Sequence, residues 1–369
     1  STNNRPTRRE GPRPRMPDMN EQTAPQAPLN LAVIGCGRIS GAHFNAAKAR
    51  PEAVRIVATH DIDAAQAQAA AEPFGALACV RFEDVLAMPE VEAVLIATPN
   101  GLHAAQSMAA LQAGKHVLVE KPAAETGEDA LALANLAAEK GLVFAVGHTF
   151  RHNDAVRYIV DHWEDFGTFR SLEVSSCVFW DGPQAPWWAT RTPEEGLILS
   201  LFAPHSLDFV QLIMGEDDPV RVHAEAARHQ SGWQGEDEAM VLLAYPGRRL
   251  ASVHISYNQP AVLDRKVLHF DKGVLEIEHG EILRWNGEEL VHPPEGVLLD
   301  PRRMGGRTLG HYFADQLSEM HAAVRGKPHR LPTGRDAARL IALIDRVKAS
   351  ARANSAADAI DPPLADAAQ

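Results

Sequence analysis

The chain has few of the features that mark secreted or membrane proteins. Only three cysteines occur among its 369 residues, Cys36, Cys79 and Cys177, and they lie far apart. An odd, scattered set excludes a disulfide framework and is typical of a reducing compartment. No apolar run approaches the roughly 20 residues that span a bilayer. Arg8 and Arg9 form a pair of the twin-arginine kind, but no apolar stretch follows them. We therefore expect a cytoplasmic protein with no membrane partner.

Positive charge is also scarce. The chain has 36 Lys and Arg against 48 Asp and Glu, which gives a formal net charge of −12. A nucleic-acid backbone would be repelled by this charge unless the basic residues were gathered on one face, and the sequence shows no such gathering in its folded part. The charge therefore predicts no nucleic-acid partner and favours a small polar or neutral substrate.

Core-forming side chains are nearly missing from residues 1–28, which contain six prolines and five arginines. Such a segment cannot offset its own ordering entropy, so we expect a disordered or extended tail. An arm that lies across a partner subunit is the alternative. The remaining length exceeds what one hydrophobic core usually serves, and we divide it into domains at 29–150 and 151–369.

The first of these domains alternates short apolar segments with segments of helical composition. Strands are predicted at 29–34, 54–59, 91–97, 116–119 and 142–146, and helices at 40–49, 64–71, 102–113 and 130–140. Strands that are apolar on both faces indicate a parallel sheet with helices on both sides. The pattern predicts a doubly wound α/β domain of the Rossmann type.

The second domain has a different pattern. Strands are predicted at 171–180, 220–228, 239–245, 250–257, 267–270 and 274–278, several of them with period-two alternation and short turns between them. That indicates a large, mostly antiparallel open sheet with one covered face. Helices predicted at 153–164, 203–214, 311–325 and 335–351 would cover it, and the last of them could pack back on the first domain. We expect an α+β domain here.

A glycine turn follows the first strand and reads Gly35-Cys36-Gly37-Arg38-Ile39-Ser40-Gly41. Gly35 permits the tight turn, and Gly37 lets the backbone approach a pyrophosphate, which the helix N-terminus then stabilises. Ser40 replaces the third glycine of the usual fingerprint with another small residue. We expect the backbone of this turn, through Arg38 and Ile39, to bind a dinucleotide.

Asp61 ends the second strand, 20 residues after Gly41. A carboxylate there accepts hydrogen bonds from the adenine ribose and repels the 2′-phosphate of NADP. No arginine follows to bind that phosphate. The sequence therefore favours NAD over NADP, although an ordinary surface aspartate is the alternative interpretation.

Three further blocks are more specific: ATPNGLH at 97–103, GKHVLVEKP at 114–122 and GHTFR at 147–151. In this order and spacing they resemble the glucose-fructose oxidoreductase / inositol dehydrogenase / MocA family. The resemblance implies an NAD(P)-dependent dehydrogenase that acts on the CH–OH groups of a sugar, glycoside or cyclitol. It also implies that the cofactor site includes Thr98, Pro99, Asn100, His103, Glu120 and Lys121.

Hydride transfer from an alcohol needs a base for the hydroxyl proton and a cation for the developing oxyanion. The resemblance implies that Lys121 lies at the nicotinamide end of the cleft and supplies the cation, and that Glu120 positions either Lys121 or a nicotinamide ribose. It also implies a cis Lys121–Pro122 bond. A lysine that only ends a strand is the alternative.

The second-domain motif of the family departs from its usual form. The resemblance implies Asp-x-Gly-x-His-x-x-Asp, and this chain has His205 and Asp208, but Leu201 at the first aspartate and Ala203 at the glycine. Leucine cannot accept a proton. His205 therefore acts as the acid/base without its aspartate, or another carboxylate replaces it. The candidates for that replacement are Asp181, Glu194 and Glu195.

Two histidine pairings have helical metal-ligand spacing, His148 with His152 and His205 with Asp208. No third ligand is evident for either, and the family implied by the resemblance generally needs none. We expect no metal.

The substrate site has its own candidates. Trp180, Trp187 and Trp188 fall in one loop before His205, and flat rings at a cleft mouth stack on sugars or aromatic aglycones. Packing in a core or a subunit interface is an equally good interpretation of these rings. Arg191 could add a hydrogen-bonding fork. The remaining substrate candidates are Arg151 and Asp208.

Three functions remain open at this stage. The leading one is a dehydrogenase that exchanges free NAD and transfers a hydride to or from a polyhydroxylated small molecule. The second is a redox-neutral glycoside-cleaving enzyme with a retained NAD, and the third is a non-catalytic regulator that binds dinucleotide and sugar. We also expect a homodimer or homotetramer, because the second face of the antiparallel sheet needs cover.

Overall fold

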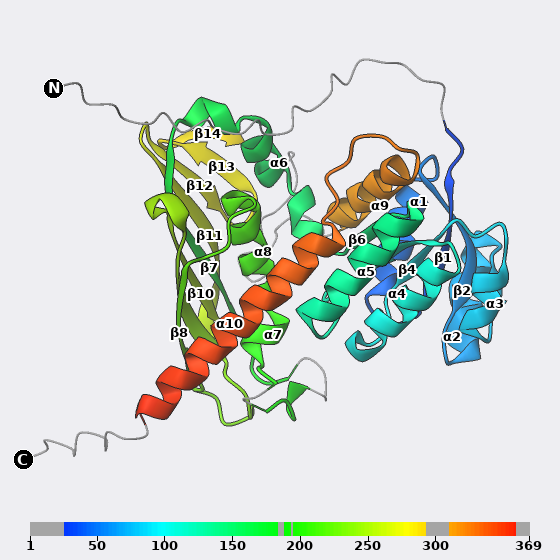
Figure 1. Cartoon of the computed structure of the whole chain (residues 1–369), viewed down its shortest axis with the longest axis horizontal. Helices are drawn as coiled ribbons and strands as arrows, with labels where there is room; N and C mark the ends of the chain where they lie inside the picture. The colour runs from blue at the N-terminus through cyan, green and yellow to red at the C-terminus, as the bar shows by residue number, and fades with distance from the viewer. Residues whose placement is uncertain (1–25, 184–187, 193–194, 293–309, 359–369) are drawn as a thin grey trace, which may run out of the picture.

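The protein contains two β-sheets that lie side by side in space, and each is packed against its own helices (Figure 1). The structure is a computed structural model, and it describes residues 26–183, 188–192, 195–292 and 310–358. The tail predicted at 1–28 therefore lies outside the described residues except for its last three positions.

The first sheet is parallel, with strand order β3-β2-β1-β4-β5-β6. Its strands are β1 (Leu29–Ile34), β2 (Val54–His60), β3 (Leu77–Cys79), β4 (Ala93–Ile96), β5 (His116–Val119) and β6 (Phe144–Val146). Alternate residues of β1 enter separate cores, Leu29, Leu31 and Val33 on one face and Ala32 and Ile34 on the other. The predicted doubly wound sheet is confirmed.

Five helices cover this sheet: α1 (Ser40–Ala49), α2 (Ala64–Ala71), α3 (Phe82–Ala87), α4 (His103–Gln112) and α5 (Gly127–Lys140). Both ends of α5 are set by local chemistry. Thr126 Oγ1 accepts the Asp129 N–H at the start, and Gly141 takes a left-handed conformation at the end. The sequence pattern missed β3 and α3, because they are short and bury only Cys79 and Val85.

The second sheet has eight strands in the order β14-β13-β12-β11-β7-β10-β9-β8. They are β7 (Phe169–Phe179), β8 (Arg221–Ala227), β9 (Glu238–Ala244), β10 (Leu250–Ser256), β11 (Asn258–Phe270), β12 (Val274–Glu278), β13 (Ile282–Trp285) and β14 (Glu288–Val291). All neighbours are antiparallel except β7 and β10. The predicted antiparallel sheet is confirmed, and it exceeds the prediction by β13, β14 and residues 258–266 of β11.

The remaining α-helices are α6 (Asp154–Asp161), α7 (Ile198–Leu201), α8 (Ala203–Met214), α9 (Gly310–Val324) and α10 (Gly334–Asp358). Helix α9 packs on α1 through Phe313 and Leu317. Helix α10 contacts α5 of the first domain and then crosses to β8 of the second sheet, which Figure 1 shows in red. The C-terminal helices thus return to the first domain.

Helix α10 also covers the open edge of the larger sheet. Strand β8 is the last strand of its sheet in the described part of the chain, so one side of its backbone has no strand partner there. Ser350 Oγ accepts the Ala224 N–H at 3.0 Å, and Asn354 Nδ2 donates to the Ala224 carbonyl at 2.9 Å. Side chains of a helix thus take the place of a ninth strand at this residue.

We expect the double substitution Ser350→Ala, Asn354→Ala to lower the free energy of unfolding by about 1–3 kcal/mol, because it leaves both backbone groups of Ala224 without their partners. Urea unfolding measures this change. The exposed Arg352→Ala on the same helix is the control and should change stability by less than about 0.5 kcal/mol. Equal effects of the two changes would contradict the edge role.

Candidate active site

The glycine turn sits against the neighbouring strand end and leaves open space above its second glycine. Gly35 has φ +90°, and a Cβ there would meet the backbone of Ala97 and Thr98 at 2.8 Å. A Cβ on Gly37 would have no atom within 4 Å of it, so a phosphate can approach the backbone there. Arg38 and Ile39 are exposed beside it.

Asp61 lies directly against this turn. Its Oδ2 accepts the Cys36 N–H at 2.7 Å, and its Oδ1 accepts the Asp63 N–H at 2.9 Å. The carboxylate is therefore held at the carboxyl end of β2, beside the turn. The open cradle at Gly37 and the oriented carboxylate together fit the adenosine half of NAD.

His103 joins two loops instead of facing solvent. Its ring is fully buried, with Nδ1 2.7 Å from the Pro122 carbonyl and Nε2 2.8 Å from the Thr98 carbonyl. Thr98 Oγ1 donates to Gln106 at 2.6 Å. His103 thus fixes the segment that contains Pro99 and Asn100, and of those two only Asn100 is part of the cleft lining described below.

Glu120 and Lys121 follow β5 at the same edge of the sheet. His43 Nε2 on α1 donates to Glu120 Oε1 at 2.7 Å. Burial would raise the pKa of Glu120, but the hydrogen bond from His43 and the charges of His43 and Lys121 outweigh it, and the pKa lies below its ordinary value. The Lys121–Pro122 bond is cis.

The ammonium of Lys121 reaches the second domain. Its Nζ donates to the carbonyl of Leu201 at 3.4 Å, and burial lowers the pKa of the amine while Glu120 opposes this. Leu201 is the residue at the position of the expected aspartate. Its side chain belongs to the core of the second domain, so only its backbone oxygen faces the lysine.

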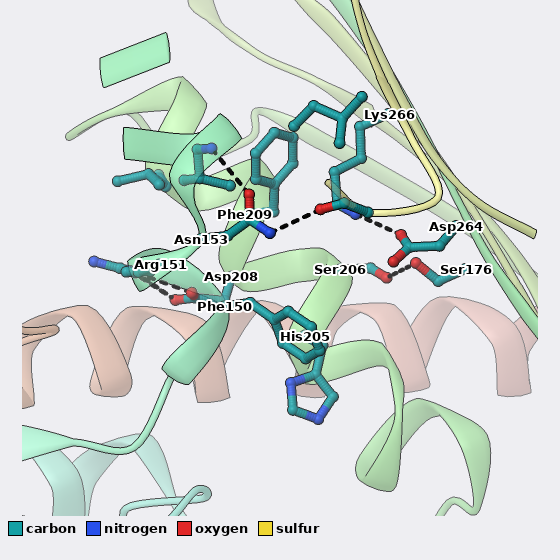
Figure 2. Close-up of a pocket in the computed structure, with 14 residues that line it drawn as sticks. Phe150, Arg151, Asn153, Ser176, His205, Ser206, Asp208, Phe209, Asp264 and Lys266 are labelled. Carbon is teal, nitrogen blue, oxygen red and sulfur yellow. Dashed lines mark hydrogen bonds and ion pairs between the residues drawn. The ribbon is translucent and has the colours of Figure 1, made fainter. Parts of the chain in front are cut away.

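His205, on α8, lies in a cavity separate from the cleft that contains Lys121. Phe150 meets its ring edge-on, with centroids 5.1 Å apart. Burial, and then the charges of Lys121 and His148, hold the pKa of His205 well below its ordinary value, so the imidazole is neutral at neutral pH. It lines a small cavity of about 30 Å³ between α8 and the sheet, and Figure 2 shows its ring turned away from the polar pairs there.

Arg151 and Asp208, both predicted substrate residues, bind each other. The guanidinium donates to both oxygens of Asp208, with Nε at 2.9 and 3.1 Å and Nη2 at 2.6 Å (Figure 2). Burial would raise the pKa of Asp208, but the charge of Arg151 outweighs it and lowers that pKa. The pair links the segment after β6 to the helix of His205.

A cleft of about 390 Å³ runs between the two domains in front of Lys121. Its wall includes residues of the β5–α5 segment, of the loop before α7 and of one face of α10. These are Asn100, Lys121, Pro122, Ala123, Ala124, Glu125, His148, Arg191, Glu195, Ser200, Leu201, Pro204, Ala337, Leu340, Ile341, Ile344, Asp345 and Lys348.

The proposed replacements for the missing aspartate have different positions. Glu195 lines the cleft, and its Oε2 accepts the Thr192 N–H at 2.8 Å. Asp181 is exposed and outside that lining, and Glu194 lies outside the described residues. Of the two candidates that the structure describes, Glu195 is thus the one that lies in the cleft with Lys121.

The tryptophan loop is joined to the core of the second domain. Trp180 packs on Tyr257 and Trp188, with ring centroids 4.6 and 5.3 Å apart, while Trp187 lies outside the described residues. This favours the packing interpretation for Trp180 and Trp188. Arg191 lines the cleft, but its Nε donates to the Gly196 carbonyl at 2.7 Å, so it also holds its own loop.

Sequence reasoning missed two parts of this cleft. His148 was weighed only as a metal ligand, although its position just after a parallel strand is a signal for a cleft residue. The apolar face of α10, with Leu340, Ile341 and Ile344, gave no signal because such a face is typical of any packed helix.

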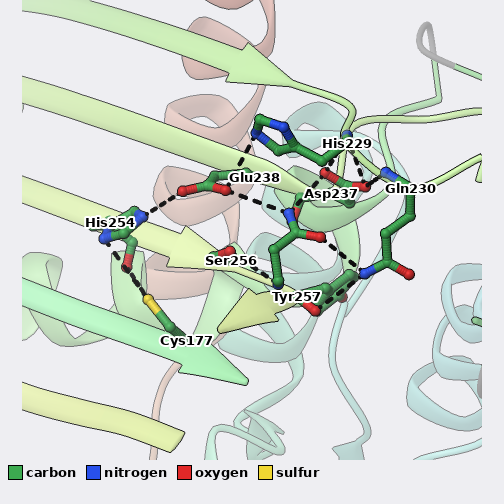
Figure 3. A network of polar contacts seen from close by, with 9 residues as sticks. Cys177, His229, Gln230, Asp237, Glu238, His254, Ser256 and Tyr257 are labelled. Carbon is green, nitrogen blue, oxygen red and sulfur yellow. Dashed lines mark hydrogen bonds and ion pairs between the residues drawn. The ribbon is translucent and has the colours of Figure 1, made fainter. Parts of the chain in front are cut away.

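A second cluster of reactive side chains lies on the open face of the larger sheet. Cys177 Sγ is 3.7 Å from His254 Nδ1, and His254 Nε2 is 2.8 Å from Glu238 (Figure 3). Burial, and then Glu238 and Asp264, raise the pKa of the Cys177 thiol to about 12. The thiol stays protonated, so this Cys–His–Glu arrangement is not an activated nucleophile.

Two classes of site find no support in the described part of the chain. It contains no group of three or more His, Cys, Asp or Glu placed to hold a metal ion. None of its helices is long and apolar enough to cross a membrane.

Two family sequence models match the chain. The model for the oxidoreductase family with an NAD-binding Rossmann fold matches residues 29–148, and the model for the GFO/IDH/MocA C-terminal domain matches residues 155–276. The chain is 28% identical to 1,5-anhydro-D-fructose reductase of Ensifer adhaerens over 262 residues, 69% of this chain and 75% of the relative. It is 27% identical to levoglucosan dehydrogenase of Pseudarthrobacter phenanthrenivorans over 264 residues, 62% of this chain and 68% of the relative.

Solved structures share the fold. Levoglucosan dehydrogenase in complex with NADH and L-sorbose superposes with a TM-score of 0.76 at 22% identity, covering 89% of this chain and 98% of its own. A putative myo-inositol dehydrogenase from Sinorhizobium meliloti gives 0.74 at 21% identity, covering 88% and 98%.

We expect Asp208→Asn to lower the free energy of unfolding by about 3 kcal/mol at pH 7, because the buried Arg151 would keep only its longer 3.8 Å pairing with Asp336. The folded pKa of Asp208 is depressed, so its stabilisation is present above the unfolded pKa of about 3.9 and is lost as pH falls through the folded value. The difference from the unsubstituted chain should therefore shrink below about pH 4. Urea unfolding across pH measures it, with the exposed Asp165→Asn as control. A loss that does not depend on pH would contradict the ion-pair account.

Proposed function

The chain belongs to the glucose-fructose oxidoreductase / inositol dehydrogenase / MocA family of NAD-binding oxidoreductases, and from this membership we propose an NAD-dependent dehydrogenase of sugars, glycosides or cyclitols. Such an enzyme transfers a hydride between nicotinamide and a secondary hydroxyl or ketone of its substrate. Residues 29–150 would bind NAD, and residues 151–369 would bind the substrate and a partner subunit.

The observation that carries this proposal is the position of Lys121. Its ammonium lies where the edge of the parallel sheet meets the second domain, in the wall of a cleft that residues of both domains form. Burial lowers the pKa of this amine, so it gives up or shares a proton more readily than an exposed lysine. Glu120, held by His43, fixes the strand end that precedes it.

NAD would supply the hydride acceptor in this cleft. On the protein side, Gly35 and Gly37 leave room for the pyrophosphate, and Asp61 accepts the ribose hydroxyls and disfavours NADP. Lys121 steadies the substrate oxygen as negative charge develops on it. The neutral imidazole of His205 is in the correct state to accept a proton.

A neutral polyhydroxylated molecule fits the lining of the cleft best. The cations Lys121, Arg191 and Lys348 are matched there by three acidic side chains, and the α10 face is apolar. The relatives named above are, by their names, an anhydrosugar reductase and a levoglucosan dehydrogenase. We assign this chain a substrate of the same chemical class.

The compartment and the assembly also belong to the proposal. Cys36, Cys79 and Cys177 are free thiols, which supports a cytoplasmic location. The open face of the larger sheet exposes a set of large apolar side chains that share one side by strand register. They are Phe179, Met240, Leu242, Leu250 and Leu263, and they support a homodimer or homotetramer through this face.

The first experiment is an acid quench of the purified chain, which measures the NAD released per chain, followed by a screen of sugars and cyclitols with added NAD. We expect NADH to form with at least one of them, and Lys121→Ala to lower kcat by about 10³-fold while NADH still binds. Lys140→Ala on α5, an exposed lysine outside the cleft, is the control. Full turnover by the Lys121 variant would contradict its assigned role. Stoichiometric release of NAD together with glycoside cleavage would move the assignment to the retained-cofactor enzyme.

The assembly has a separate test. Leu242→Glu places a charge in the exposed apolar set and should convert the oligomer to monomers, because burying an unpaired carboxylate costs several kcal/mol. Size-exclusion chromatography with light scattering measures the mass. Val160→Glu, on an equally apolar exposed position of α6, is the control and should leave the mass unchanged. A wild-type chain that is already monomeric would contradict the proposed assembly.

A further inference from the structure

The cleft lacks a free carboxylate at the place where the family motif has one. Leu201 offers Lys121 only a carbonyl, and Glu120 is already bound to His43. The acidic residues of the lining, Glu125, Glu195 and Asp345, are all exposed; Glu195 accepts a backbone N–H, and Asp345 lies 3.7 Å from Lys348. None of the three carboxylates in the lining is buried, and His205 lines the neighbouring cavity and not this cleft.

His148, by contrast, lines this cleft. It comes two residues after β6, at the same edge of the sheet as Glu120 and Lys121. A Cβ on the preceding Gly147 would lie 3.2 Å from the Glu120 carboxylate, so the backbone passes closely against this pair. The side chain of His148 then forms part of the cleft wall together with Lys121.

The ring of His148 has an unused nitrogen. The residue is 3% exposed, and its Nδ1 is buried with no hydrogen-bond partner among the described residues. Buried polar atoms in folded proteins are nearly always hydrogen-bonded, and the exceptions concentrate at functional sites. His148 is thus a cleft-wall residue with hydrogen-bonding capacity that the described residues do not use.

The surrounding charges keep this ring neutral. Burial lowers the pKa of His148 most strongly; Asp208 and Glu120 oppose this, while Arg151 and Lys121 lower it further. A neutral imidazole has one nitrogen lone pair, which can accept a proton. His148 also contributes to the depressed pKa of His205, so the two imidazoles and the ammonium of Lys121 lie within electrostatic range of one another.

We propose that His148 is a proton-transfer residue that replaces the carboxylate missing at Leu201. During oxidation the carbinol carbon gives its hydride to NAD, which becomes NADH. The hydroxyl proton passes to a ring nitrogen of His148 and from there to solvent, and the carbon–oxygen bond becomes a carbonyl. Lys121 holds the oxygen throughout. This role rests on the proposed dehydrogenase function.

The test uses the full chain with the substrate found in the screen and compares His148→Asn with His152→Asn. His152 is a matched control because it is 1% exposed and lies only four residues further along the chain. Among the described residues it also has a ring nitrogen without a partner, yet it is absent from the cleft lining. We expect His148→Asn to lower kcat by about 100-fold and to flatten the acidic limb of the kcat–pH profile. NADH affinity should change by less than about threefold, and His152→Asn should keep kcat.

The pH profile separates chemistry from packing. A purely structural role of His148 would lower kcat without flattening the acidic limb of the kcat–pH profile. If His148→Asn does not fold, His148→Gln carries the same comparison.

The outcomes are distinct. An active wild-type chain whose His148 variants keep kcat and the pH profile would overturn the inference alone. An equal loss in His152→Asn would also overturn it, because packing would then explain the effect. A wild-type chain without turnover on any sugar or cyclitol would overturn the proposed function and the inference with it.

Discussion

The buried ion pair of Arg151 and Asp208 is the interaction on which the geometry of the cleft depends. Arg151 belongs to the segment that leaves the parallel sheet, and Asp208 lies one helical turn after His205 on α8. Separating two buried opposite charges would leave each charge uncompensated, which costs several kcal/mol. The pair therefore fixes the position of α8 relative to the end of β6. That placement brings Leu201 to Lys121 and His205 to Phe150. Both residues looked like substrate ligands in the sequence, and the structure shows them using their hydrogen-bonding capacity on each other.

Much of the fold could be predicted from the sequence because its signals are local. The bounds of β1, α1, α2 and β5 follow from apolar runs, small residues and turns next to each other in the chain. The cis bond before Pro122 was implied by the family resemblance and is present. The misses have a common reason: β3, α3, β13 and β14 are short and bury few side chains, so their structure depends on neighbours far away in the sequence.

The candidate site shows where single-sequence reasoning ends. The glycine turn, Asp61 and Lys121 each have a motif around them, and the structure gathers them along one sheet edge. Nothing in the chain near Leu201 points to His148, which lines the same cleft as Lys121 but lies 53 positions earlier in the sequence. Burial and an unused nitrogen, which decide its importance, exist only after folding. The same holds for His103, whose motif is typical of a cofactor contact but whose ring holds two loop carbonyls together.

Helix α10 has a mechanical consequence for the cleft. Its 25 residues form a rod about 37 Å long, which contacts α5 near one end and β8 near the other. The same helix also forms one wall of the cleft. If the two domains rotated apart about the segment after β6, α10 would therefore lose its contacts with one of them. Admission and release of ligands are therefore compatible with sliding of packed surfaces and with loop movement, but not with a wide hinge. The width of the cleft therefore depends on how α10 packs on both domains.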